Sequence, residues 1–423
     1  MKKFLALILA SLLTVSMVAC SSTDTKDDAN TPAGDNSAET KTEDTTKDTA
    51  KVTAENIKVG FIFVGDENEG YTQAHSDGAK AMAKELGLKE DQIITKWLIP
   101  ENEQCYEAAV DLAEAGCSII FANSFGHEDY ILQAAKEYPE IQFCHATGYR
   151  AASSKLSNMH NYFTAVYESR YVSGVVAGLK LKQLIDEGAI TADQAKLGYV
   201  GAYSYAEVVS GYTAFFLGVR SIVPEATMSV KYTGSWADQS AEKEVASALI
   251  ADGCVLISQH ADTTGAPAAC EAAKVYDVGY NIDMIPTAPN YALTSASINW
   301  APYYTYAVKS ILDGTTIDTD WCQGYADGAD KITVLNEKAV APGTAEKVKE
   351  IEDAIKAGTL KVFDTKTWTV DGKEITTTKG AELEADYHDQ EYIIDGTFAE
   401  STLGSAPAFA FRVDGITELN QVF

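Results

Sequence analysis

The chain has 423 residues, of which 46 % are hydrophobic and 22 % are charged, so it is long enough for two hydrophobic cores. It carries 33 Lys and Arg against 61 Asp and Glu, a formal net charge of −28. Such a charge repels phosphate backbones and anionic headgroups, which disfavours binding to nucleic acid or to a membrane through surface charge. Small neutral or cationic ligands remain compatible with it.

The N-terminus has the pattern of an export signal. Two lysines precede an apolar run over residues 4–13 that is too short to span a bilayer. The run leads to Cys20 through a stretch that resembles the bacterial lipobox, in which the Cys is lipidated and becomes the mature N-terminus; Met17 stands where that motif usually has Leu. We expect a lipoprotein signal peptide over residues 1–19 and a lipid anchor at Cys20. An ordinary secretory signal is the alternative.

A polar segment follows the cysteine. Residues 21–50 contain no Ile, Leu, Val, Met or aromatic residue. Such a composition cannot bury enough apolar surface to fold, so we expect residues 20–55 to form a disordered acidic tether that begins at the lipidated Cys20. This arrangement predicts a protein held at the cell membrane by its lipid, with the folded part on the extracytoplasmic face.

Strand-like and helix-like segments alternate after the tether. Residues 57–64 form a continuous apolar run, which is typical of a strand covered on both faces. Further strands are expected at 92–99, 118–122 and 141–146, with helices at 71–86, 101–115 and 128–138. This spacing predicts βαβ units that build a parallel sheet.

The pattern then starts again. A long helix over residues 167–187 is followed by expected strands at 196–200, 227–232, 255–258 and 275–280, and by helices at 206–223, 238–251 and 267–273. Two strings of the first series match the second in order and at a nearly constant offset: 58–61 matches 196–199, and 115–120 matches 252–257. We therefore expect two α/β lobes of the same plan.

Each predicted lobe is a parallel sheet flanked by helices. We assign residues 56–162 plus 284–330 to lobe one and residues 163–283 plus 331–423 to lobe two, and we give the acidic stretch 365–400 no role. Parallel sheets carry their ligand loops at the carboxyl ends of the strands, so two facing lobes predict a ligand cleft between them.

The sequence offers no motif for a metal, a cofactor or catalysis. No two cysteines have C-x-x-C spacing, and no P-loop, G-x-S-x-G or H-E-x-x-H string occurs. Cys117, Cys144 and Cys254 lie in apolar runs and are expected to be buried free thiols, although the sequence leaves disulfides open. We expect no metal, no cofactor and no enzyme activity. A secreted hydrolase acting on nucleosides and a surface adhesin lipoprotein are the alternatives.

Several local strings resemble one known family. They are residues 58–63 before an acidic loop, 135–139 before a strand, 198–201, 232–238, 279–283 and 293–295. With the lipobox and the two lobes, they are similar to the basic membrane protein family, the purine-nucleoside-receptor-like group of ABC-transporter lipoproteins. The resemblance covers about residues 57–314. It implies a type I periplasmic-binding-protein-like fold, a purine nucleoside or nucleobase as ligand, and an ABC permease as partner.

The resemblance also implies site residues. The family holds a purine between aromatic side chains of both lobes, and Tyr71 and Trp236 stand where these are expected, with Phe125 beside the first. Asn123 and His260 end corresponding strands of the two lobes. All five are therefore predicted to contact the ligand. The chain is expected to act as a monomer and to bind no nucleic acid.

Two carboxylates and one further aromatic complete the predicted site. Asp262, at the end of a lobe-two strand, would accept hydrogen bonds from the ligand, and Asp283 is a second candidate. Nucleoside binders of the family have a basic residue shortly after the Thr-Ser pair, which is residues 294–295 here. Residues 296–300 of this chain contain no basic residue. Its absence favours a free nucleobase or another flat ligand, with Trp300 as a stacking surface. A binder of another small solute, such as a sugar, remains the alternative.

Overall fold

The computed structural model describes residues 51–381, 383 and 390–423. The predicted signal peptide over residues 1–19, Cys20 and the tether up to residue 50 lie outside the described residues. Residues 51–423 form one compact unit. Within the part of the chain that is described, no helix combines the length and the apolar character needed to cross a membrane.

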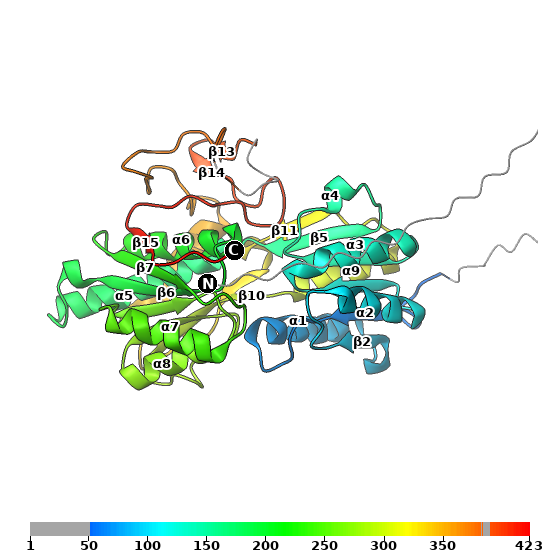
Figure 1. The fold of residues 1–423 in the computed structure, drawn as a ribbon, viewed down its shortest axis with the longest axis horizontal. Helices are drawn as coiled ribbons and strands as arrows, with labels where there is room; N and C mark the ends of the chain where they lie inside the picture. The colour runs from blue at the N-terminus through cyan, green and yellow to red at the C-terminus, as the bar shows by residue number, and fades with distance from the viewer. Residues whose placement is uncertain (1–50, 382, 384–389) are drawn as a thin grey trace, which may run out of the picture. The chain divides into compact units, whose positions relative to one another are not determined.

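The first sheet has the strand order β11-β5-β4-β3-β1-β2, and all its neighbouring strands are parallel (Figure 1). Its strands are β1 (Val59–Ile62), β2 (Ile93–Lys96), β3 (Ile119–Ala122), β4 (Gln142–Ala146), β5 (Met159–Thr164) and β11 (Asp320–Gln323). Every residue of β1 and β3 is buried, as the continuous apolar runs predict. The helices of this part are α1 (Gly70–Leu86), α2 (Glu103–Glu114), α3 (Glu128–Glu137), α4 (Ala151–Ser154) and α9 (Ala301–Asp313). We call this sheet with these helices lobe one.

The second sheet has the order β12-β10-β9-β8-β6-β7-β15, parallel except where β12 pairs with β10. Its strands are β6 (Lys196–Gly201), β7 (Thr227–Tyr232), β8 (Leu256–Gln259), β9 (Tyr276–Tyr280), β10 (Ala292–Ile298), β12 (Asp330–Ile332) and β15 (Ile416–Glu418). Helices α5 (Tyr167–Asp186), α6 (Ala206–Arg220), α7 (Gln239–Ala251), α8 (Gly265–Ala273) and α10 (Thr344–Lys356) pack against it or against one another. We call this part lobe two. The predicted α/β architecture with two parallel sheets is confirmed.

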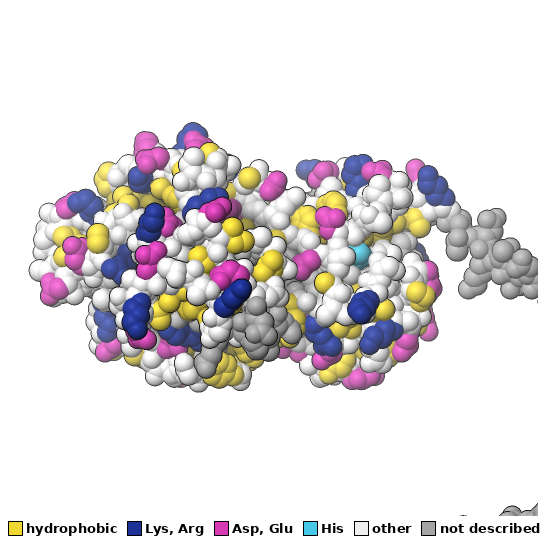
Figure 2. Space-filling model, turned by 90° about the horizontal axis from the view of Figure 1, so that it is seen from above, with side chains coloured by type: hydrophobic (Ala, Val, Ile, Leu, Met, Phe, Trp, Pro, Cys, Tyr) yellow, Lys and Arg dark blue, Asp and Glu magenta, His cyan; other side chains and the backbone are white. Residues whose placement is uncertain are grey.

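Shorter elements join these parts. The 3-10 helices are η1 (Glu90–Gln92), η2 (Phe125–His127), η3 (Ala192–Gln194) and η4 (Tyr325–Asp327). Near the C-terminus, β13 (Ile393–Ile394) and β14 (Thr397–Phe398) form a separate two-stranded sheet. Figure 2 shows acidic and basic side chains interspersed on the face that it presents.

The predicted assignment of residues 284–298 to lobe one is wrong. β10 pairs in parallel with β9, and Ser295 lies opposite Gly279 in the second sheet. The chain returns to lobe one only after β10, where α9 packs against α1. β10 is buried along its whole length, so its composition reports burial but not the sheet with which it pairs.

Among the described residues, the chain passes between the two sheets at residues 165–166, 299–300 and 324–329. Two of these segments are joined by a hydrogen bond from the backbone amide of Asn299 to the carbonyl oxygen of Ala329, at 2.8 Å. The hydroxyl of Thr164 donates to Asp330 Oδ1 at 2.7 Å beside them. These short segments are the natural hinge for any movement of one lobe against the other.

Helices α5 and α6 pack closely enough to exclude side chains at two glycines. A Cβ at Gly174 would lie 2.1 Å from the Phe215 carbonyl oxygen, and one at Gly218 would lie 2.2 Å from the Tyr171 carbonyl oxygen. Both contacts are with backbone, which cannot move aside cheaply. This packing fixes α6 against α5, and Glu207 in the first turn of α6 lines the cavity described below.

The six cysteines of the described residues are all unpaired. Cys117, Cys144 and Cys254 are buried, which confirms the prediction of buried free thiols. Burial raises the pKa of the Cys117 thiol to about 11 and that of Cys144 to about 12. These thiols therefore stay protonated at neutral pH and are unreactive in the folded chain.

Candidate ligand-binding site

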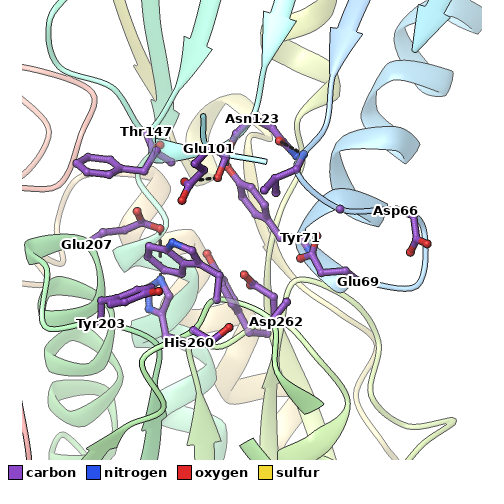
Figure 3. A pocket seen from close by; sticks show the side chains of 18 of the residues that line it. Asp66, Glu69, Tyr71, Glu101, Asn123, Thr147, Tyr203, Glu207, His260 and Asp262 are labelled. Carbon is purple, nitrogen blue, oxygen red and sulfur yellow. Dashed lines mark hydrogen bonds and ion pairs between the residues drawn. The ribbon is translucent and has the colours of Figure 1, made fainter. Parts of the chain in front are cut away.

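A cavity of about 460 Å³ lies between the carboxyl ends of the two sheets (Figure 3). This volume is within the usual range for small-molecule sites. The loops after β1, β3 and β4 line it from lobe one, and the segments after β6, β7 and β8 line it from lobe two. Its lining residues are Val64, Gly65, Asp66, Glu69, Tyr71, Leu98, Glu101, Asn123, Ser124, Phe125, Thr147, Tyr203, Glu207, Ser235, Trp236, Ala237, His260, Asp262 and Tyr280.

Lobe one contributes two aromatic rings to this cavity. Tyr71 lies in the first turn of α1, and its hydroxyl donates to the carbonyl oxygen of Asn123 at 2.6 Å. Its ring packs edge-on against the buried His75 at 4.5 Å between centroids. Phe125 follows β3 and stacks on Tyr205 of lobe two, with centroids 5.7 Å apart. These contacts fix the orientations of both rings.

Lobe two presents the opposing aromatic wall. Trp236 lies between β7 and α7 and is half-buried. Its ring packs edge-on against Tyr203 at 5.3 Å, and Tyr203 stacks on Tyr205 with an interplanar angle of 20°. Aromatic side chains of the two lobes therefore face the same cavity, an arrangement suited to a flat ligand with two π-faces.

Asp262 is the deepest carboxylate of the cavity. It is 6 % exposed, and its Oδ1 accepts a hydrogen bond from Nδ2 of Asn281 at 2.7 Å. Burial raises the pKa of Asp262 well above its ordinary value, and the negative charges of Glu69, Glu242 and Glu207 add to this effect. Because ionisation is costly here, an N–H or O–H donor on a ligand would stabilise the charged carboxylate.

Glu69 forms the N-cap of α1. Its carboxylate accepts from the backbone amides of Tyr71 at 2.8 Å and Thr72 at 3.0 Å. Burial raises the pKa of Glu69, and these N–H groups oppose that effect. The amide of Gly70, the residue directly after Glu69, donates to the Asp262 carbonyl oxygen at 3.0 Å. The two lobes therefore touch directly at the edge of the cavity.

A second polar group lies on the lobe-two side. His260 Nε2 is 3.4 Å from Glu207 Oε1, and His260 Nδ1 is 3.4 Å from the hydroxyl of Tyr199. Burial and the charge of Arg170 lower the pKa of His260 well below its ordinary value, so the imidazole is neutral at neutral pH. It can therefore offer one donor and one acceptor.

Tyr280 ends β9 beneath this group. Its side chain is 2 % exposed, and its hydroxyl has no hydrogen-bond partner among the described residues. Arg170 lies over the Tyr280 ring at 3.5 Å and donates through Nη1 to the Gln259 carbonyl oxygen at 2.6 Å. A buried hydroxyl without a partner is costly, and a polar group of a ligand could satisfy it.

The structure brings six of the eight predicted ligand residues to this cavity. They are Tyr71, Asn123, Phe125, Trp236, His260 and Asp262. Their contact with a ligand stays a prediction. Asp238, in the loop that carries Trp236, does not line the cavity and instead caps α7 through the amides of Ser240 and Ala241.

Asp283 and Trp300, the other two predicted ligand residues, do not line this cavity. Asp283 Oδ1 accepts from the Ile285 amide at 2.9 Å in a local turn. Trp300 is fully buried in lobe one and stacks on His75 at 3.9 Å. Its ring belongs to the core beneath α1 and α9, because the chain has already crossed back to lobe one at this point.

Most of the other lining residues are absent from the predicted site, among them Glu101, Thr147, Tyr203, Glu207 and Tyr280. Thr147, Tyr203 and Tyr280 end or follow strands, so the same topological rule could have found them. Glu101 is fixed by the Ser124 hydroxyl at 2.6 Å and the Gly126 amide at 2.8 Å, contacts that only the folded chain reveals. In the described part of the chain, no group of three or more His, Cys, Asp or Glu is arranged to hold a metal ion.

Two known proteins are similar to this chain over much of their sequence. The chain is 34 % identical over 324 residues to a purine-binding protein of Brucella abortus, covering 76 % of this chain and 87 % of the other. It is 28 % identical over 297 residues to a Haloferax volcanii protein provisionally named an ABC transporter glucose-binding protein, covering 70 % of each.

A solved structure shares the fold. An ABC transporter solute-binding protein from Conexibacter woesei superposes with a TM-score of 0.59 at 20 % identity, covering 72 % of this chain and 98 % of the other. The type I periplasmic-binding-protein-like fold expected from the sequence is thereby confirmed. The family resemblance is confirmed separately, by a family model. The model of the family described as ABC transporter substrate-binding protein PnrA-like matches residues 56–365. The chain therefore belongs to the Bmp family of ABC transporter substrate-binding proteins.

Proposed function

We propose that this substrate-binding protein captures a purine base or nucleoside in the cavity between its lobes and delivers it to an ABC permease. The observation that carries the proposal is the placement of Tyr71 and Trp236, from opposite lobes, around one cavity of about 460 Å³. Purines offer two flat faces for stacking on such rings. The similarity to a purine-binding protein supports the same ligand class.

The polar lining favours a ligand with several hydrogen-bond donors. Five carboxylates line the cavity: Asp66, Glu69, Glu101, Glu207 and Asp262. Figure 3 places Asp66 at the periphery and Glu207 and Asp262 close to the centre. No Lys or Arg is among the described lining residues, so a phosphate group would meet only like charge. The proposal therefore includes bases and nucleosides and excludes nucleotides.

A sugar is the second candidate ligand. The similarity to the provisionally named glucose-binding protein favours it, and carboxylates such as Asp262 and Glu207 could accept bonds from sugar hydroxyls. A sugar has no π-face of its own, so it would make weaker use of opposing rings on both sides of the cavity. The two candidates therefore differ in how much binding depends on Tyr71 and Trp236 together.

Titration calorimetry on the chain from residue 51 tests the proposal. The panel is adenine, guanine, adenosine, inosine, adenosine monophosphate, glucose and xylose. We expect heat with at least one base or nucleoside and none with the nucleotide. Binding of glucose or xylose alone would overturn the purine assignment and leave the fold and family unaffected.

The proposal also covers catalysis and location. We propose that the protein binds without converting its ligand, since the family consists of substrate-binding proteins. Incubation with adenosine or inosine should release no free base, whereas a nucleoside hydrolase would release it. A surface adhesin would bind no small ligand in the panel.

We further propose that the chain is a monomer anchored by lipid at Cys20 on the extracytoplasmic face.

A further inference from the structure

The C-terminal loop, which we define as residues 400–407, lies beyond the part of the chain that the family model matches. Its base belongs to lobe two. The carboxylate of Glu400 accepts from the backbone amides of Ala408 at 3.1 Å and Phe409 at 3.0 Å, which closes the loop on itself. The Phe409 ring then stacks on Phe363 at 4.4 Å, and Phe363 packs against Tyr167 of α5. The loop is thus rigidly fixed to lobe two.

The tip of the same loop contacts lobe one. The backbone amide of Ser405 donates to Oδ1 of Asp320 at 2.9 Å, and Asp320 begins β11 at the edge of the first sheet. Ser401 of the loop lies beside the thiol of Cys322, which is also on β11. Ser405, Ala406 and Pro407 are all buried. In Figure 1 this red segment runs from the lobe that contains β15 and α6 toward β11.

The loop also reaches the ligand cavity. Ala406 and Pro407 line a small void of about 20 Å³ together with Phe125, Thr147, Tyr149, Tyr205 and Glu207. Three of these residues, Phe125, Thr147 and Glu207, also line the main cavity. Ala406 and Pro407 therefore stand behind the residues that face the ligand, where the stacked rings of Phe125 and Tyr205 join the two lobes.

We infer that the C-terminal loop is a third part of the ligand site, which ties lobe two to lobe one through Ser405 and Asp320 and holds Phe125 against Tyr205. Asp320 is then a positioning residue that stabilises the closed arrangement of the lobes. Because a ligand that touches both lobes binds the closed state, weakening the tie lowers its apparent affinity in proportion to the closed fraction that remains. This inference rests on the proposed function for its ligand.

The test compares three variants of Asp320 and its surroundings. Asp320→Ala removes the acceptor, whereas Asp320→Asn keeps an amide oxygen that can still accept from Ser405. Asp318→Ala is the matched control, because the Asp318 side chain is exposed two residues earlier on the same approach to β11. Hydrogen exchange in the ligand-free protein is followed in a peptide that contains Ser405 and in one that contains Gly70, whose amide bonds across the lobes to Asp262.

Asp320→Ala is expected to speed exchange in both peptides, and to weaken binding of the best base or nucleoside by about tenfold with faster dissociation. Asp320→Asn and Asp318→Ala should resemble the parent protein. Faster exchange at Ser405 without any change at Gly70 would overturn the inference, and so would unchanged affinity and dissociation. If the parent protein binds no base or nucleoside, the proposed function fails. The rate of exchange at Gly70 in Asp320→Ala, compared with the parent, then shows whether the Ser405–Asp320 bond holds the lobes together.

Discussion

The backbone amide of Gly70, at the start of α1, donates a hydrogen bond to the carbonyl oxygen of Asp262, at the end of a strand in the opposite lobe. A side chain at position 70 would bring its Cβ to 3.0 Å from the same oxygen. A larger residue here would push this carbonyl away by a few tenths of an ångström, so glycine favours the close contact of the lobes. Since this contact borders the cavity, we expect the bond to break when the lobes open for a ligand and to reform when they close.

Replacing Trp236 should separate stacking from the rest of the site. We expect Trp236→Ala to weaken binding of the best base or nucleoside by about 1–3 kcal/mol, taking base–aromatic stacking as the guide. The ligand-induced change in tryptophan emission should also largely disappear. Calorimetry and fluorescence titration measure both effects.

Trp368→Phe is the control for this change, because Trp368 packs against Phe409 and Phe411 and does not line the cavity. It should keep parent affinity and the parent emission change. A Trp236→Ala protein that binds and responds like the parent would show that Trp236 is not part of the ligand site.

Replacing Asp262 should test the charge in the cavity. Asp262→Asn keeps the shape of the side chain but removes its charge, so we expect weaker binding through loss of a charge-assisted hydrogen bond, by about 1.5–3 kcal/mol. Asp283→Asn is the matched control outside the cavity. Equal affinities for the two variants, measured by calorimetry, would contradict the role given to Asp262.

Asp277 should make folding stability depend on pH. Burial raises the pKa of Asp277 to about 8, and neither carboxyl oxygen has a hydrogen-bond partner among the described residues. The folded chain therefore holds this proton where the unfolded chain, with a pKa of about 3.9, has lost it. The stability contribution is fully present below about pH 4 and is lost as the pH rises toward about 8.

Asp277→Asn should therefore flatten the decline in stability between about pH 5 and about pH 8, with a gain of a few kcal/mol at the upper end. Urea unfolding at several pH values measures the difference from the parent. Glu242 and Glu400, whose pKa values burial raises to about 7, persist in the variant and keep a residual slope. The exposed Glu90→Gln serves as control, and an identical slope for Asp277→Asn and the parent would refute the assignment.

Gly218→Ala should destabilise lobe two. Its new Cβ would meet the Tyr171 carbonyl oxygen at 2.2 Å, so α5 and α6 must separate. Overpacking of this kind costs about 1–3 kcal/mol or more in the free energy of unfolding. Thermal or urea unfolding measures it, with the exposed Lys182→Ala on α5 as control. Similar midpoints for both variants would mean that the helices are less closely packed than described.

Cys20→Ala should release the protein from membranes. A lipidated N-terminal Cys supplies the acyl chains needed for stable anchoring. Cell fractionation after a salt wash should find the variant in the soluble fraction and the parent in the pellet. Sedimentation of both proteins with membranes would contradict a lipid anchor at Cys20.

The sequence predicted the sheets well where burial alone determines the pattern. The apolar run around β1 identified a strand covered on both faces, and the repeated spacing identified two lobes. β10 was assigned to the wrong lobe because pairing with β9 is a tertiary property. A buried run of small and apolar residues fits either sheet equally well.

The site was predictable where topology alone positions a residue. Asn123, His260 and Asp262 follow strand ends, and all three line the cavity. Trp300 lies outside the cavity, because an aromatic ring before a helix can pack into the core as easily as it can face a ligand. Glu207 was missed because an acid in the first turn of a helix already has a sufficient explanation in the helix dipole.

The unpaired cysteines give this protein a property that matters outside the cell. None of the six cysteines in the described part of the chain forms a disulfide, so we expect a reducing agent to leave the stability of this part unchanged. Cys117, Cys144 and Cys254 are shielded only while the chain is folded, because all three are buried. We therefore expect a thiol-reactive dye to label these three thiols only in molecules that unfold, whereas Cys322 is less shielded in the folded chain.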